Sequence, residues 1–204
     1  MKINFKNTFF IALAAVSLTG CVSDDDTSLP SYSPLMLSQK FEGIADNIVL
    51  DTTNLPEWIN YSESGSAKWR SQVYSGNGYA EFNPYASGDA TNVGWLISPA
   101  FSLEGTENKL SFKVSQSYVS SAANSLEVLV SEDFDGTNVL GATWTTLNAE
   151  LPGTDAEYFL FQRSQVDLSE FAGATRLYLA FKVKGSGTNT ALDGAYQIDN
   201  VTVY

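Results

Sequence analysis

The sequence predicts an all-β fold, a two-sheet antiparallel β-sandwich, on three observations. Short segments rich in β-branched and aromatic residues recur along the chain, and turn residues separate them. Several of these segments alternate apolar and polar residues, which is the period of a strand with one buried face. The one helix-like pattern, Leu168 to Ala172, suffices for a single turn. With 204 residues, 44% of them hydrophobic, the chain can bury one sizeable core.

The clearest strands lie between Gly94 and Tyr118. From Leu110 to Ser115 apolar and polar residues alternate strictly, so one face is expected in the core and the other in water. The run Trp95 to Ile97 is densely apolar, and Pro99 predicts its end because proline cannot donate to a strand ladder. Arg176 to Lys184 alternates in the same way, which predicts a second core strand with one wet face.

The folded domain is expected over residues 39–204, following a leader at 1–20 and a disordered acidic tether at 21–38. Its expected strands, in chain order, are Asn47 to Asp51, Glu57 to Tyr61, Ala67 to Arg70, Tyr79 to Phe82, Gly94 to Ile97, Leu110 to Tyr118, Ser125 to Ser131, Thr143 to Leu147, Phe159 to Val166, Arg176 to Lys184 and Tyr196 to Tyr204.

Composition excludes several classes of function. The net charge is -12, and no Lys/Arg cluster is present to neutralise phosphates, so no nucleic-acid partner is expected. The chain contains no His and one Cys. Ser-His-Asp and Cys-His catalysis, zinc sites with His ligands and an internal disulfide are therefore excluded.

The N-terminus predicts a lipid anchor. Lys2 and Lys6 precede an apolar run from Phe9 to Val16, which is too short to span a bilayer and is typical of a secretory signal peptide. The next residues, Leu18-Thr19-Gly20-Cys21, resemble the lipobox of bacterial lipoproteins, in which the Cys is lipidated after cleavage. Cys21 is the only Cys of the chain, which sharpens this prediction.

An acidic stretch, Asp24 to Asp26, opens the tether, and two prolines follow it. One interpretation is a solvated acidic linker. The other is a resemblance to the acidic tag that follows the lipidated Cys in surface-exposed lipoproteins of some anaerobic Gram-negative bacteria. With the predicted lipidation of Cys21, the expected location is the bacterial outer membrane, and the tag interpretation adds exposure at the cell surface.

The folded part resembles the choice-of-anchor J and cleaved-adhesin domains of bacterial surface proteins. The matching segments are Phe41-Glu42-Gly43, Trp95-Leu96-Ile97-Ser98-Pro99 with Phe101 and Leu103, Leu110-Ser111-Phe112, Leu126 to Ser131, Asp133-Phe134-Asp135-Gly136, Trp144 to Leu147, Val166 to Ser169, Ala180-Phe181 and Ile198 to Val203. The resemblance implies a jelly roll of the galactose-binding and MAM-like type. It also implies adhesion or carbohydrate binding without catalysis.

The same resemblance implies a structural calcium ion held by carboxylates where the first and last strands meet. The candidates are Glu42 and Asp199. Alternation would place Ile198 and Val201 on opposite faces, and a bulge at Asp199-Asn200 would turn both inward. Oxygen ligands suit calcium. The alternative is that both carboxylates cap strand ends by accepting backbone hydrogen bonds.

The segment Asp133 to Gly136 is compared with a calcium loop, but Trp144 stands where that loop requires its Glu. A solvated turn is the favoured interpretation. No spacing singles out the acid and nucleophile of a glycosidase either, so no enzyme is expected.

The aromatic residues divide into two groups. Trp95, Trp144, Phe112 and Phe181 lie on apolar faces and are expected in the core. Trp58, Trp69, Tyr74 and Tyr85 lie among Ser, Gly and Asn, where exposed rings could stack on sugars, and they are the candidate ligand-binding residues. Two further rings of this kind are Tyr79 and Tyr118.

Three functions remain open. A glycan-binding module predicts exposed aromatic rings in a concave polar setting. A structural or adhesive subunit that recognises protein predicts a contiguous apolar patch or an open sheet edge. A glycan hydrolase needs carboxylates that face one cleft and have perturbed pKa values.

Overall fold

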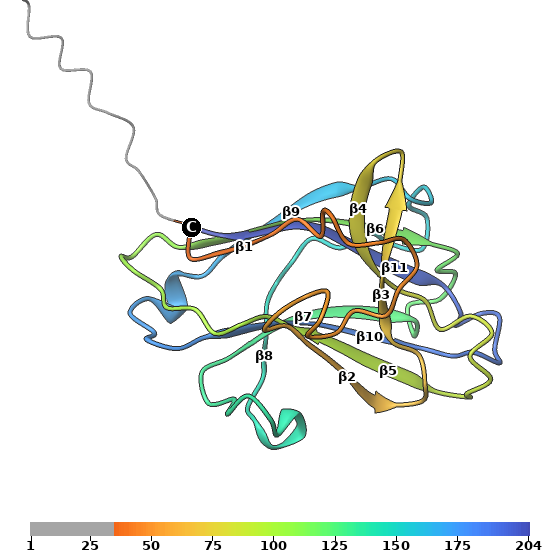
Figure 1. The fold of residues 1–204 in the computed structure, drawn as a ribbon, viewed down its shortest axis with the longest axis horizontal. Helices are drawn as coiled ribbons and strands as arrows, with labels where there is room; N and C mark the ends of the chain where they lie inside the picture. The colour runs from red at the N-terminus through yellow and green to blue at the C-terminus, as the bar shows by residue number, and fades with distance from the viewer. Residues whose placement is uncertain (1–34) are drawn as a thin grey trace, which may run out of the picture. The chain divides into compact units, whose positions relative to one another are not determined.

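Two antiparallel sheets pack face to face in the computed structural model, which describes residues 35–204 and confirms the expected sandwich (Figure 1). The leader, Cys21 and the tether up to residue 34 lie outside the described residues. Within 35–204 no helix has the length and apolar content needed to cross a membrane.

The six-stranded sheet has the order β3-β4-β11-β6-β9, and β1 also pairs with β11. Its strands are β1 (Leu37–Gln39), β3 (Trp69–Tyr74), β4 (Asn77–Phe82), β6 (Lys109–Ser117), β9 (Gln162–Asp167) and β11 (Ala195–Val203). The five-stranded sheet has the order β2-β5-β10-β7-β8. Its strands are β2 (Ile59–Ser64), β5 (Asn92–Ile97), β7 (Ser125–Ser131), β8 (Thr145–Thr146) and β10 (Tyr178–Gly185).

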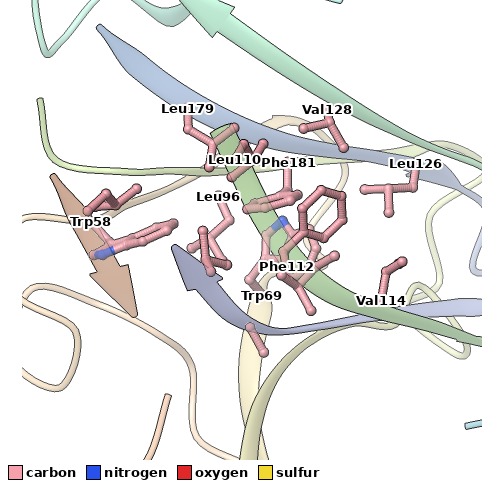
Figure 2. Close-up of a cluster of buried hydrophobic side chains, with 14 of the residues drawn as sticks. Trp58, Trp69, Leu96, Leu110, Phe112, Val114, Leu126, Val128, Leu179 and Phe181 are labelled. Carbon is pink, nitrogen blue, oxygen red and sulfur yellow. The ribbon is translucent and has the colours of Figure 1, made fainter. Parts of the chain in front are cut away.

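The main core lies between the sheets and follows from the alternation of the strands. Leu110, Phe112 and Val114 of β6 point inward, as the sequence predicts (Figure 2). From the opposite sheet Phe181 of β10 meets Phe112 edge to face, with 5.3 Å between ring centroids. Such a pair adds about 0.5–1.5 kcal/mol to the free energy gained by burying its area.

A second apolar cluster covers the outer face of the five-stranded sheet. Tyr178 and Ala180 of β10 lie in it, beside Trp95 of β5 and Phe134. The expectation that β10 has one wet face is therefore wrong over this half of the strand, because the segment with the 3-10 helix η1 (Val139–Gly141) packs its apolar residues there. Trp144 joins the cluster, 5.3 Å from Trp95.

Some element bounds differ from expectation. The first strand begins at Leu37, two residues inside the expected tether, because Leu37 to Gln39 pair with the end of β11. Residues 47–51 form no strand and contribute one bridge, Val49 to Arg70. The expected turn at 168–172 is the 3-10 helix η2 (Ser169–Phe171).

The predicted bulge in the last strand is confirmed. The register of β11 against β6 shifts between Asp199 and Thr202, and Asn200 has a left-handed φ of 50°. Ile198 and Val201 are consequently both buried in the main core. At the bulge β11 also changes partner, from β4 along 196–198 to β1 along 201–203. This change brings the residues that follow β1 close to Asp199.

Candidate ligand-binding face

A groove of about 600 Å³ lies on the outer face of the six-stranded sheet. Its lining residues come from four strands and from the connection that precedes β9: Tyr74, Asn77, Tyr79, Lys113, Phe159, Phe161 and Asp199. We call it the sheet groove.

Strand alternation places the central residues of the sheet groove in one row. Asp199 of β11 is paired with Lys113 of β6, and Ile198 with Ala80 of β4, so Asp199 lies next to Tyr79. Ala80 and Ile198 point into the core. Their sequence neighbours Tyr79 and Asp199 must therefore point outward, toward the groove.

Aromatic rings wall the sheet groove on two sides. Tyr79 and Phe161 contact edge to face at 5.5 Å. Tyr74 and Phe159 are more open, with exposed fractions of 75% and 48%. Phe159 adopts a left-handed φ of 60°, and its backbone N–H donates to the carbonyl of Gln116. The backbone therefore holds this ring over the sheet.

A buried polar network adjoins the groove in the next row of the same face. The Gln197 amide donates to Glu81 Oε2 at 2.9 Å and to Ser117 Oγ at 3.1 Å, and it accepts from Ser115 Oγ at 2.8 Å. Burial raises the pKa of the Glu81 carboxyl, while hydrogen bonds from Gln197, Asn83 and Gln72 oppose that shift. A hydrogen-bonded network of this kind fixes the sheet face that supports the groove.

Asp199 is the carboxylate at the end of the groove, and it is 1% exposed. It accepts from the backbone N–H of Asn200 at 2.6 Å, from Asn200 Nδ2 at 2.9 Å and from Asn77 Nδ2 at 3.4 Å. Desolvation raises the pKa of Asp199; these hydrogen bonds and Lys113 oppose the shift, and the nearby charge of Glu42 adds to it. The two predicted metal ligands, Glu42 and Asp199, are thus brought together.

Glu42 and the carbonyl of Phe41 both lie against Gly78, the residue after Asn77. Glu42 Oε2 accepts from the backbone N–H of Gly78 at 3.3 Å. A Cβ on Gly78 would lie 2.5 Å from the carbonyl oxygen of Phe41, so the glycine leaves room for that carbonyl. Phe41 itself has a left-handed φ of 56°. No group of three or more Asp, Glu, His or Cys side chains forms a metal cluster among residues 35–204, so further ligands would be amide, backbone or water oxygens.

The prediction of exposed, ligand-binding rings is wrong for two residues. Trp58 is 3% exposed and Trp69 is 0% exposed, and both belong to the main core (Figure 2). Trp58 packs edge to face on Phe41, and Trp69 packs on Phe82. For Trp69, on β3, the polar sequence neighbours were misleading, because on a strand they point to the opposite face. Trp58 lies just before β2, in a connection that packs into the core. Tyr74 lines the sheet groove, and Tyr85 lines a separate pocket.

Sequence reasoning missed Phe159, Phe161 and Lys113 as groove residues. Residues 159–166 were expected to form one strand, but β9 begins at Gln162. A signal was present: Tyr158 to Phe161 are four apolar residues in a row, which breaks the alternation of a half-buried strand. Lys113 was expected on a wet face, which is the face that carries the groove.

The segment from Asp133 to Gly136 is a turn, as the sequence favoured. Asp135 Oδ1 accepts from the backbone N–H groups of Thr137 and Asn138, at 2.7 and 2.8 Å. Asp133 Oδ1 accepts from Thr143 N–H at 2.8 Å. These bonds lower the pKa values of both carboxyls. The two carboxylates thus stabilise the loop that carries η1.

Comparison with known proteins supports the architecture. No protein-family model matches the sequence, and no curated protein does. Three solved cleaved adhesin domains of Lys-gingipain match the structure. The K1 domain from Porphyromonas gingivalis W83 is 21% identical, with a TM-score of 0.51 over 82% of this chain and 96% of that chain.

The K2 domain of Lys-gingipain is 14% identical, with a TM-score of 0.54 over 82% of this chain and 98% of that chain. The K3 domain from the same organism as K1 is 18% identical, with a TM-score of 0.50 over 83% of this chain and 99% of that chain. At these identities the likeness establishes the fold, a jelly-roll β-sandwich, and leaves the ligand to be argued from the groove.

Proposed function

We propose that this protein is a lipid-anchored surface protein whose jelly-roll domain binds glycans in the sheet groove without catalysis. The observation that carries the proposal is the groove itself: the exposed rings of Tyr74 and Phe159 flank a mainly apolar hollow that also presents the polar side chains of Asn77 and Lys113. Its volume of about 600 Å³ lies in the range of small-molecule sites, roughly 300–1,000 Å³.

The chemistry of the groove suits a sugar. Aromatic ring faces bury the apolar C–H faces of pyranose rings, and fixed polar groups satisfy the hydroxyls. Asn77 supplies an amide and Lys113 an ammonium donor. These groups come from β4 and β6, so a rigid sheet positions them.

We propose that the groove is not catalytic because of the number of its carboxylates and the hydrogen bonds that they accept. A glycosidase needs two carboxyl groups that flank the scissile bond. Among the described residues that line the sheet groove, Asp199 is the one carboxylate, and hydrogen bonds from Asn200 and Asn77 occupy both of its oxygens. Glu81 is engaged by the buried amide network rather than open to the groove.

Calcium remains a proposal for the pair Glu42 and Asp199. The chemistry of the residues fits a hard cation, because both carboxylates contact the segment Asn77–Gly78, against which the oxygen of the Phe41 carbonyl also lies. A bound calcium ion would supply positive charge to a buried carboxylate that faces mainly amide donors. It would also link the segment after β1 to β11, which are distant in sequence.

A second candidate function, adhesion to a protein, draws on the exposed run Tyr158, Phe159 and Leu160, since contiguous apolar residues are typical of protein contacts. The same experiment separates the two functions. A glycan array is probed with the full-length protein, and its Tyr74→Ala and Phe159→Asn variants are compared. Asn tolerates the left-handed backbone at residue 159.

Each substitution removes an exposed ring, so we expect the dissociation constant for a bound glycan to rise about tenfold or more, as roughly 1.5–3 kcal/mol of ring burial is lost. The melting temperature should barely change. Leu140→Ala is the matched control, because it removes an exposed apolar side chain from η1 over the other sheet. Binding to no glycan on the array would refute the glycan-binding function and leave adhesion to a protein as the candidate.

A further inference from the structure

A second pocket, of about 530 Å³, lies where the loops β4–β5, β6–β7 and β10–β11 meet at one end of the sandwich. Three tyrosines from three separate segments line it, Tyr85, Tyr118 and Tyr158. Their exposed fractions are 68%, 62% and 52%. We call it the tyrosine pocket. Large rings gathered in a hollow and left open to solvent are typical of a binding surface.

The two central rings are held in place rather than free. Tyr118 and Tyr158 contact each other with ring centroids 4.6 Å apart and planes inclined by 46°. Tyr118 adopts a left-handed φ of 59°, a conformation that is strained for an aromatic residue. The structure around it must therefore stabilise this geometry.

Gln116, which is fully buried, supplies that support. Its Oε1 accepts from the backbone N–H of Val119 at 3.0 Å, and its Nε2 donates to the carbonyl of Ala156 at 2.7 Å. Its own carbonyl accepts from the N–H of Phe159 at 2.8 Å. One buried amide thus ties the turn that carries Tyr118 to the segment that carries Tyr158. The platform is preorganised, which lowers the entropic cost of binding.

The rim chemistry identifies the ligand class. Asn83, Ser120 and Asp193 add amide, hydroxyl and carboxylate groups beside the rings. The carboxylate and the net charge of -12 disfavour an anionic ligand. Tyr118 and Tyr158 are in mutual contact, so a cation cannot sit between them as it does in an aromatic cage. An open apolar surface of tyrosine rings with hydroxyl and amide partners fits an uncharged sugar.

We propose that the tyrosine pocket is a second carbohydrate site, which takes a neutral sugar residue and is distinct from the sheet groove. The proposal rests on the proposed glycan-binding function. The connection before β9 contributes to both sites, because its Tyr158 lines the tyrosine pocket and its Phe159 and Phe161 line the sheet groove. Two sites on one domain give avidity on a surface that displays many glycan ends.

The test is a titration of the full-length, ¹⁵N-labelled protein with neutral methyl glycosides and with glucuronic acid, followed through backbone amide signals. We expect neutral sugars to shift the amides of Tyr118 and Ser120 in the tyrosine pocket. Tyr158→Ala and Tyr118→Asn should weaken that response at least tenfold while the amides of Asn77 and Lys113 respond as in the wild type. Asn is chosen at 118 because it tolerates the left-handed backbone.

Tyr74→Ala is the reciprocal control, because it removes a ring from the sheet groove and leaves the tyrosine pocket intact. If sugars shift the groove amides alone, or if the two tyrosine variants titrate like the wild type, the second site is overturned and the proposed function stands. A response at the tyrosine pocket to glucuronic acid alone overturns the assignment of a neutral ligand. If neither site responds to any sugar, both proposals fail.

Discussion

Asp199 carries a buried carboxylate that the sequence predicted as a metal ligand. Its carboxylate is buried at the bulge of β11, where amide groups donate to it and no cation lies within ion-pairing distance; Lys182 to Glu63 is the one ion pair of residues 35–204. Desolvation raises its pKa, and the charge of Glu42 adds to the shift. A buried charge with incomplete compensation lowers stability unless a positive partner arrives.

We therefore predict opposite effects of Asp199→Asn with and without calcium. In excess chelator the variant should melt at or above the wild-type temperature, because a desolvated charge has been removed. With calcium at one hundred times its dissociation constant the wild type should gain about 2.7 kcal/mol, and the variant should lose most of that gain. Thermal melts of both proteins in chelator and in calcium measure the difference.

The pH dependence gives the control. A carboxyl whose folded pKa is raised contributes stability below its unfolded pKa and loses it as pH rises through the folded value. In chelator the wild type should therefore gain stability relative to Asp199→Asn as pH falls from neutral toward the ordinary range of Asp. An unchanged melting curve with excess chelator, in protein that contains no calcium by elemental analysis, would leave Glu42 and Asp199 as strand-end caps.

At the same scale the sequence predicted some side chains and misplaced others. The bulge at Asp199 was predictable, because Ile198 and Val201 are three positions apart and a regular strand would place them on opposite faces. Trp58 and Trp69 were predicted to be exposed because polar residues surround them in the sequence, yet both are buried. Which face of a strand a residue occupies is known only once its partner strand is known, and Trp69 is paired with Phe82, which is itself buried.

The strands themselves were largely predictable, and the exceptions have physical causes. Leu37 to Gln39 are too short and too polar to indicate a strand alone, and they form one because the end of β11 offers a free edge. Conversely, Phe159 to Phe161 have strand composition, yet the left-handed φ of Phe159 keeps them out of β9. The sheet groove depends on this exception, and the sequence indicated it only through the four consecutive apolar residues Tyr158 to Phe161, which break the alternation of a strand.

At the scale of elements, β4 and β5 pack against each other from opposite sheets, and this contact leads to a prediction about stability. Gly94 of β5 faces the ring of Phe82 from the opposite sheet, and a Cβ there would overlap that ring. Phe82 is fully buried and cannot move aside. We predict that Gly94→Ala lowers the free energy of unfolding by about 1–3 kcal/mol, the usual effect of overpacking a core.

Chemical denaturation measures this change, and Gly153→Ala is the matched control. A Cβ at Gly153 would meet only the end of the Asp155 side chain, which is free to turn away. The control should therefore change stability by less than about 0.5 kcal/mol. Equal denaturation midpoints for Gly94→Ala and the wild type would mean that the two sheets separate locally at no cost, contrary to the packing of Phe82.

For the whole molecule, the net charge favours an uncharged ligand. The chain has 23 acidic and 11 basic residues and a pI near 4.2. Such a charge repels polyanions at long range and leaves short-range contacts in the groove to select the ligand. Both proposed sugar sites lie on or beside the six-stranded sheet. The position of the domain then depends on how its N-terminal end is held.

That dependence leads to the anchoring prediction, which rests on Leu18-Thr19-Gly20-Cys21 and on the single Cys of the chain. Lipidation would add several acyl chains at one residue, enough for stable attachment, whereas one chain gives reversible binding. Cys21→Ser should therefore move the protein from the membrane fraction to the soluble fraction. Ser23→Ala, which keeps the Cys, is the control and should remain with membranes. An unchanged membrane partition of Cys21→Ser would end the lipoprotein interpretation, because attachment to the membrane would then not depend on the thiol of Cys21.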